Sequence, residues 1–145
     1  MTINRRHFIS ASAGITAAMS APMVFGASRP KVVIIGGGAG GATAARYIAK
    51  DSKGAIDVTL VEPTRSYYTC FFSNLYLGGF KDFDSIGHTY GKLANDYGIN
   101  DVHDWAVDVD SNGRTVALAG GGSLSYDKLI LSPGIDFVDG SVPGW

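Results

Sequence analysis

Cysteine is nearly absent from this chain, because Cys70 is the only one among 145 residues. A lone cysteine cannot form a disulfide within the chain, so a disulfide-stabilised scaffold is excluded. The pattern alone leaves four interpretations of Cys70. It is a small buried residue, a free thiol, a partner in an intermolecular disulfide, or an attachment point for a cofactor.

Charged and metal-binding side chains are also scarce. Charged residues make up 17% of the chain, and Glu62 is the only glutamate. His88 and His103 lack the clustered ligands that metal sites use, so we interpret both as structural or surface residues and expect no metal. Without the first 28 residues, ten basic side chains oppose thirteen acidic ones. The resulting net charge near −3 argues against nucleic-acid binding.

Residues 1–28 have the layout of an export signal. Arg5 and Arg6 precede an uncharged, weakly apolar run from Phe8 to Phe25 that is rich in alanine, serine and glycine. This layout is typical of a twin-arginine signal, with a cleavage region at residues 26–28. The alternative is a membrane anchor, but the many small and hydroxylated residues disfavour insertion. We therefore expect export to the periplasm and no stable membrane insertion.

An uninterrupted apolar run, Val32–Ile35, leads into a glycine cluster. This pattern predicts a buried parallel strand that enters a tight turn. The cluster contains G-x-G-x-x-G as Gly36, Gly38 and Gly41. In order, these glycines permit the bend out of the strand, the close approach of a pyrophosphate, and the packing of the next helix on the strand. We expect that helix over residues 39–50, with its N-terminus facing the phosphates.

The residues that follow supply the context that this motif requires. A second strand is predicted over residues 57–62 and ends in Glu62, 21 positions after Gly41. Strand, helix and strand together have the size of a β-α-β unit. The Glu62 carboxylate can then accept hydrogen bonds from the ribose hydroxyls of an adenosine. A glycine-rich turn alone can be purely structural, but this combination favours a dinucleotide site.

The remainder of the chain predicts more sheet. An aromatic stretch around Cys70 is followed by a surface helix or pair of turns over residues 83–97, whose apolar stripe covers the sheet. From Val102, strands broken by turn signals indicate a β-meander over residues 102–109, 115–119 and 123–132. We therefore assign residues 29–145 to one α/β domain. It is Rossmann-like, with a parallel sheet and an inserted β-meander, and it is incomplete at the C-terminus because such a sheet needs more strands.

Three segments closely resemble the flavoprotein subunit of flavocytochrome c sulfide dehydrogenase, in the FAD/NAD(P)-binding pyridine nucleotide-disulfide oxidoreductase superfamily. They are VVIIGGGAGGATAARYI (32–48), YYTCFFSN (67–74) and YDKLILSPGI (126–135). The resemblance covers residues 31–135 but only the first part of that family's length. It implies FAD joined to Cys70 by a thioether at the flavin 8α-methyl. It also implies that Ala106 lies near the adenine, and that Pro133 and Gly134 belong to a second FAD signature, with Ser132 in the usual alanine position.

The resemblance also implies an activity. In the family, sulfide attacks a redox-active disulfide, and electrons pass through FAD to a c-type cytochrome subunit. We thus expect a sulfide dehydrogenase flavoprotein with a small inorganic sulfur substrate and a dihaem cytochrome partner. Neither cysteine of that disulfide is in this chain, so it contains no catalytic residues.

Two alternatives remain open. One is a sulfide:quinone-type oxidoreductase with the same FAD half, and the other is a flavin-binding redox partner without turnover of its own. A plain NAD(P) dehydrogenase explains neither Cys70 nor the Ser-Pro-Gly strand end, and the chain has no second G-x-G-x-x-G for a nicotinamide.

Overall fold

The computed structural model describes residues 28–136 and Gly140. A four-stranded parallel sheet in the order β5-β2-β1-β9 forms its centre. The strands are β1 (Lys31–Ile35), β2 (Asp57–Val61), β5 (Asn100–Val102) and β9 (Lys128–Leu131). The predicted parallel sheet and the first two strands are confirmed, although β2 ends one residue before Glu62.

The unbroken apolar run of β1 is explained by its position in the middle of the sheet. Val32 and Ile34 belong to a core cluster on the helix side, with Val58 and Leu60 of β2. Val33 belongs to a second cluster that includes Val61 and Val116, on the other side. Because successive side chains of a strand point to opposite faces, a strand covered on both faces needs apolar residues throughout.

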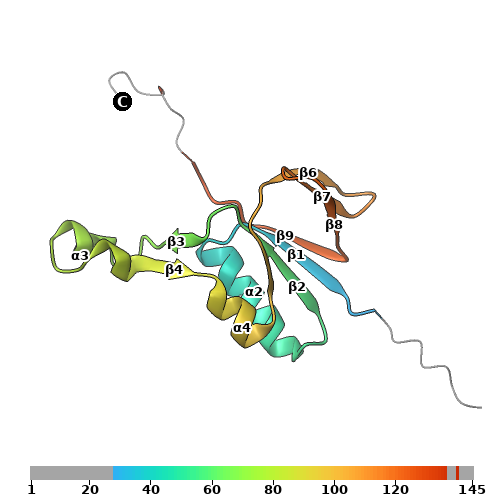
Figure 1. Cartoon of the computed structure of the whole chain (residues 1–145), viewed down its shortest axis with the longest axis horizontal. Coiled ribbons are helices and arrows are strands. Elements are labelled where there is room, and N and C mark those ends of the chain that lie inside the picture. The colour runs from blue at the N-terminus through green and yellow to red at the C-terminus, as the bar shows by residue number, and fades with distance from the viewer. Residues whose placement is uncertain (1–27, 137–139, 141–145) are drawn as a thin grey trace, which may run out of the picture.

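Helices cover one face of the sheet (Figure 1). Helix α2 (Ala39–Ser52) buries Gly41, Ala45 and Ala49, which follow one another at intervals of four residues. These small side chains lie on one side of the helix, so its axis comes close to the strands. Helix α4 (Gly91–Tyr97) packs beside α2. Among the described residues, no helix has the length and apolar character needed to span a membrane.

The β-meander covers the other face and precedes the last strand of the parallel sheet, as predicted (Figure 1). It consists of β6 (Ala106–Asp110), β7 (Thr115–Leu118) and β8 (Ser123–Ser125) in an antiparallel sheet. The prediction of one strand over residues 102–109 is wrong, because Val102 ends β5 in the parallel sheet. The chain turns between the sheets at Asp104, whose Oδ1 accepts hydrogen bonds from the N–H groups of Trp105 (2.7 Å) and Gly120 (3.2 Å).

A projecting arm separates β2 from α4 (Figure 1). It contains β3 (Ser66–Tyr68), α3 (Ser73–Leu77), the 3₁₀-helix η1 (Phe83–Ile86) and β4 (Gly87–Thr89). Residues 83–97 are therefore not one surface helix, because β4 pairs antiparallel with β3 and interrupts it. The part of the expected stripe formed by Tyr90, Leu93 and Tyr97 does pack against the sheet.

Candidate nucleotide-binding site

The glycine turn leaves the carboxyl end of β1, and the chain itself requires glycine at two of its positions. Gly36 has φ +99°, and a Cβ there would strike the carbonyl oxygen of Ser132, just after β9. At Gly41, a Cβ would strike the carbonyl oxygen of Gly36. Ser132 is held in place because its N–H donates to the Ile35 carbonyl at 2.8 Å. The turn is therefore closely packed between β9 and α2.

Gly38 differs from these two glycines because nothing in the described structure requires it. It is the N-cap of α2, with φ −67° and ψ −169°. The nearest atom to a Cβ at this position is Tyr67 Cε2 at 3.8 Å, an ordinary contact. A side chain there would instead occupy the space in front of the α2 N-terminus, which is where an anion binds to a helix.

The N-terminus of α2 has the properties of an anion site. Its first turn contains no acidic residue and no side chain caps it. Among residues 28–136, no protein group accepts a hydrogen bond from the N–H of Gly38 or Ala39. These donors lie at the positive end of the helix dipole, so they favour a negatively charged partner.

Glu62 lies directly after β2 and is hydrogen-bonded to the glycine turn. Its Oε2 accepts from the Gly37 N–H at 2.7 Å, and its Oε1 accepts from the N–H (3.0 Å) and O–H (2.6 Å) of Thr64. Burial raises the pKa of Glu62, but the hydrogen bonds from Thr64 and Gly37 outweigh it, so the pKa is lowered on balance. The carboxylate is thus ionised and fixed beside the turn.

A cleft of about 250 Å³ brings four of the predicted site residues together. They are Gly36, Glu62, Ala106 and Pro133, from the carboxyl ends of β1, β2 and β9 and the start of β6. Gly134, with φ +79°, follows directly on the exposed chain. The carboxyl edge of a parallel sheet is where open α/β folds bind ligands. Asp104 and Trp105 also line this cleft, and no sequence motif marks them.

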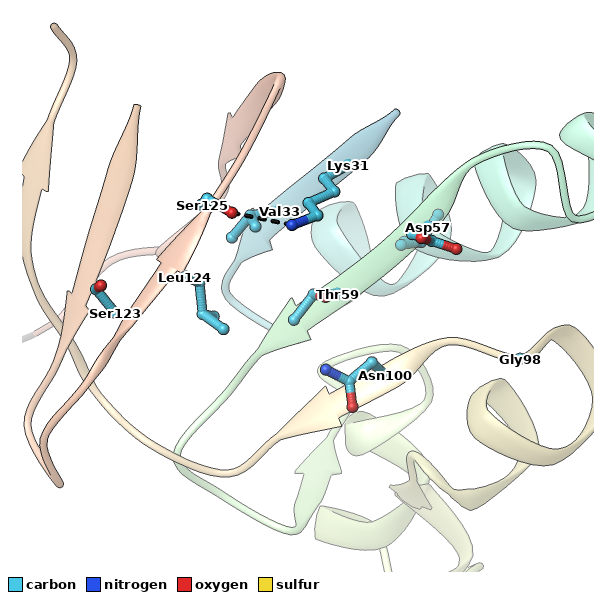
Figure 2. Close-up of a pocket in the computed structure, with 10 residues that line it drawn as sticks. Lys31, Val33, Asp57, Thr59, Gly98, Asn100, Ser123, Leu124 and Ser125 are labelled. Atoms are coloured by element: carbon cyan, nitrogen blue, oxygen red, sulfur yellow. Dashed lines mark hydrogen bonds between the residues drawn. The ribbon is translucent and has the colours of Figure 1, made fainter. Parts of the chain in front are cut away.

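A larger cavity of about 440 Å³ lies at the opposite end of the strands. Figure 2 shows it between the parallel sheet and β8, with Lys31, Thr59 and Asn100 around it. Lys31 Nζ donates a hydrogen bond to Ser125 Oγ at 3.1 Å, and both residues line this cavity. None of the predicted site residues lines it.

Cys70 lies outside the cleft, on the arm between β3 and α3. Its side chain is exposed, so the interpretation as a small buried residue is wrong. Its carbonyl accepts hydrogen bonds from the Ser73 O–H (2.8 Å) and N–H (3.2 Å), which fixes the backbone beside the thiol. The next two residues, Phe71 and Phe72, are 63% and 67% exposed, so exposed apolar side chains follow Cys70 directly in the chain.

Tyr90 belongs to the site although no sequence motif predicts it. Its side chain is 5% exposed, and its O–H donates to the Gly37 carbonyl at 3.0 Å. Burial, and then the nearby Glu62 carboxylate, raise its pKa to about 12, so it remains a donor. The spacing of the stripe placed Tyr90 in the core, but gave no sign that its hydroxyl reaches a turn 53 residues earlier.

The histidines do not form a metal centre. His103 is exposed, and its Nδ1 lies 3.2 Å from the Glu62 carbonyl oxygen. His88 is exposed on β4. Within residues 28–136, no group of three or more histidine, cysteine or carboxylate side chains is arranged to hold a metal ion.

Comparison with known proteins agrees with this geometry. The sequence profile of the family described as pyridine nucleotide-disulphide oxidoreductase matches residues 30–145. The chain belongs to this family. A pyridine nucleotide-disulphide oxidoreductase of this type is a flavoprotein, so membership implies FAD as the cofactor.

Among its relatives, the chain is 52% identical over 44 residues to the sulfide dehydrogenase (flavocytochrome c) flavoprotein chain of Chlorobaculum thiosulfatiphilum, covering 30% of this chain and 90% of that sequence. It is 30% identical over 112 residues to the sulfide-quinone reductase of Aquifex aeolicus (strain VF5), covering 76% and 25% of the two chains. The resemblance to the flavocytochrome c flavoprotein is therefore confirmed, and this oxidoreductase is of the sulfide dehydrogenase and sulfide:quinone reductase type.

The fold is likewise that of solved flavoprotein oxidoreductases. The structure of the sulfide:quinone oxidoreductase from Aquifex aeolicus superposes with a TM-score of 0.68 at 25% identity. The match covers 77% of this chain and 26% of the other. The chain thus spans about a quarter of the length of the sulfide:quinone reductase that it matches.

Proposed function

We propose that this chain is the FAD-binding part of a sulfide-oxidising flavoprotein that delivers electrons to a c-type cytochrome. The observation that carries the proposal is the pairing of an ionised Glu62 with free N–H donors at the α2 N-terminus. This pairing suits a nucleotide, because the carboxylate can accept from ribose hydroxyls and the donors can bind phosphate oxygens.

The residues present fit FAD. Glu62 would hold the adenosine ribose, and the backbone of Gly38 would bind the pyrophosphate. Ala106 and Pro133 line the cleft beside Glu62, where an adenine would lie. When bound, FAD accepts two electrons from a substrate and passes them on singly or together. The chain's own residues bind and orient the cofactor.

We further propose that Cys70 forms a thioether with the flavin 8α-methyl group. Its exposure on the arm supports this, because a thiol must be accessible to react. Forming the bond would release the thiol proton and one proton from the methyl group. The two electrons would reduce the flavin ring, and the proposed c-type cytochrome would then take them up and restore the oxidised flavin. The exposed phenyl rings of Phe71 and Phe72 would cover an apolar ring system next to that sulfur.

The partner and compartment follow from the similarity and the predicted signal. The Chlorobaculum relative is named as the flavoprotein chain of a sulfide dehydrogenase (flavocytochrome c), which supports a c-type cytochrome partner and sulfide as substrate. The family resemblance of the sequence adds that this cytochrome subunit would be dihaem. The twin-arginine signal over residues 1–28, which falls outside the described residues except for Ser28, supports export to the periplasm. A quinone acceptor is the second candidate, favoured by the sulfide-quinone reductase match over 76% of the chain.

The experiment is a test for flavin on the denatured polypeptide. The protein is produced with residues 1–28, purified from the periplasm and precipitated in acid, and flavin fluorescence is measured on the pellet and in the supernatant. We expect fluorescence on the polypeptide, lost in Cys70→Ser, which keeps the size of the side chain but has no thiolate. Flavin that is released entirely would contradict the thioether and move the assignment to the quinone-reducing relatives.

A further inference from the structure

The glycine turn is held from both sides at Gly37, the first variable position of the motif. The Gly37 N–H donates to Glu62 Oε2 at 2.7 Å, and the Gly37 carbonyl accepts from the Tyr90 O–H at 3.0 Å. Neither partner belongs to the turn: Glu62 follows β2, and Tyr90 precedes α4. Both backbone polar groups of one residue are therefore fixed by side chains from other elements.

The bond from Tyr90 has a geometric consequence for the next residue. The Gly37 carbonyl and the Gly38 N–H belong to one peptide unit, which is planar and trans, so they point in opposite directions. A hydrogen bond that draws the carbonyl toward the core therefore turns the Gly38 N–H outward. That N–H has no acceptor among residues 28–136, and it lies at the N-cap of α2.

The ring of Tyr90 is held in a fixed position by the core around it. Its ring is packed in the core cluster with Val32, Ile34 and Leu60, and it is 5% exposed. The ring also fills the space beside Gly37, because a Cβ there would lie 2.5 Å from the Tyr90 hydroxyl oxygen and 2.8 Å from Glu62 Cγ. The turn therefore fits against Tyr90 as well as bonding to it.

From these contacts we propose that Tyr90 is a positioning residue for the dinucleotide pyrophosphate. By holding the Gly37 carbonyl, it aims the Gly38 N–H at the phosphate that binds in front of α2. This inference rests on the proposed function, because it needs a nucleotide at the turn. It adds to the motif a residue outside the β-α-β unit.

The test compares Tyr90→Phe with Tyr97→Phe in a Cys70→Ser background, from which flavin can be removed because no thioether forms. Each variant loses one hydroxyl hydrogen bond. Tyr90 belongs to the core cluster and Tyr97 packs against it, but the Tyr97 hydroxyl accepts from Arg46 Nε at 3.0 Å rather than bonding to the turn. The probes are ADP, which carries a pyrophosphate, and adenosine, which lacks one. Affinities are measured by isothermal titration calorimetry.

We expect Tyr90→Phe to weaken ADP binding about threefold to tenfold, the effect of one hydrogen bond. Adenosine binding should stay unchanged in this variant, and Tyr97→Phe should bind both probes as the unchanged chain does. Equal losses for ADP and adenosine would overturn the proposal, because they would show a purely structural role. If the unchanged chain binds neither ADP nor FAD, the proposed function itself is wrong.

A measurement on the unchanged chain keeps the proposal testable if Tyr90→Phe fails to fold. The Gly38 amide resonance in an NMR spectrum should move on addition of ADP and stay in place on addition of adenosine. A Gly38 amide that responds equally to both probes, or to neither, would contradict an N–H aimed at the phosphate.

Discussion

Gly38→Ala should separate ligand binding from folding. The backbone at Gly38, with φ −67° and ψ −169°, is accessible to alanine, and the added methyl group would meet only Tyr67 Cε2 at 3.8 Å. Alanine restricts the unfolded chain more than glycine does, which raises the free energy of unfolding by about 0.4–1 kcal/mol. Alanine is also a poorer N-cap than glycine, which lowers the free energy of unfolding by roughly a similar amount. The free energy of unfolding should therefore change by less than about 1 kcal/mol.

The same methyl group would stand between the α2 N-terminus and an approaching phosphate. Losing one hydrogen bond to a charged group costs about 1.5–3 kcal/mol. This corresponds to a loss of FAD affinity of about tenfold to a hundredfold. The assay uses the Cys70→Ser chain, which can be freed of flavin, as the background for every variant. It is titrated with FAD while the quenching of flavin fluorescence is followed, and thermal unfolding is measured on the same samples.

Two other glycines provide the controls for this prediction. Gly91→Ala, at the first residue of α4 with open space around its Cβ, should bind FAD and unfold as the unchanged chain does. Gly36→Ala should prevent folding, because its Cβ would strike the Ser132 carbonyl at a positive φ. If Gly38→Ala binds FAD normally, or unfolds as readily as Gly36→Ala, the assignment of the turn to the pyrophosphate is refuted.

Three further predictions concern the groups around the turn. Since the pKa of Glu62 is lowered from 4.5, its stabilising contribution is complete above pH 4.5 and is lost as the pH falls through the lowered value. Glu62→Gln should remove this contribution to the pH dependence of the free energy of unfolding, measured in urea. The same loss of stability at low pH in the variant and in the unchanged chain would contradict the prediction. Since the pKa of Tyr90 is raised from 10.0 to about 12, its contribution is complete below pH 10 and is lost toward pH 12. Tyr90→Phe should remove the tyrosinate absorbance step near pH 12. Gly41→Ala should destabilise the chain by about 1–3 kcal/mol in urea unfolding, because its Cβ would strike the Gly36 carbonyl.

The β-α-β unit is predictable because its signals are local. The apolar run of β1, the glycine turn and the acid after β2 all lie within residues 31–62, and each has one structural explanation. The meander is predictable in outline because turn signals separate its strands. The boundary between β5 and β6 is not predictable, because residues 102–109 continue one alternating pattern while the chain passes from the parallel sheet to the meander. That passage depends on Asp104 bonding to the Gly120 N–H, 16 residues away.

The arm and Tyr90 show why tertiary contacts override local patterns. Residues 83–97 carry apolar side chains at helical spacing, yet Gly87–Thr89 forms a strand because Ser66–Tyr68 lies beside it. The stripe correctly placed Tyr90 in the core. Helical spacing predicts which face is buried, but it does not predict the acceptor of a buried hydroxyl, and that acceptor is what makes Tyr90 part of the site.

Glu62 and Tyr90 have opposite roles at the same residue, Gly37. Glu62 stays ionised and accepts from the Gly37 N–H, whereas Tyr90 stays protonated and donates to the Gly37 carbonyl. Side chains thus satisfy the turn on the side that faces the core, while the N–H groups of Gly38 and Ala39 find no acceptor among residues 28–136. The first N–H groups of any helix have no partner within the helix, and a capping side chain, water or an anion can accept from them. Because no side chain caps α2 and its first turn holds no acidic residue, these donors and the glycine motif together fit a phosphate ligand.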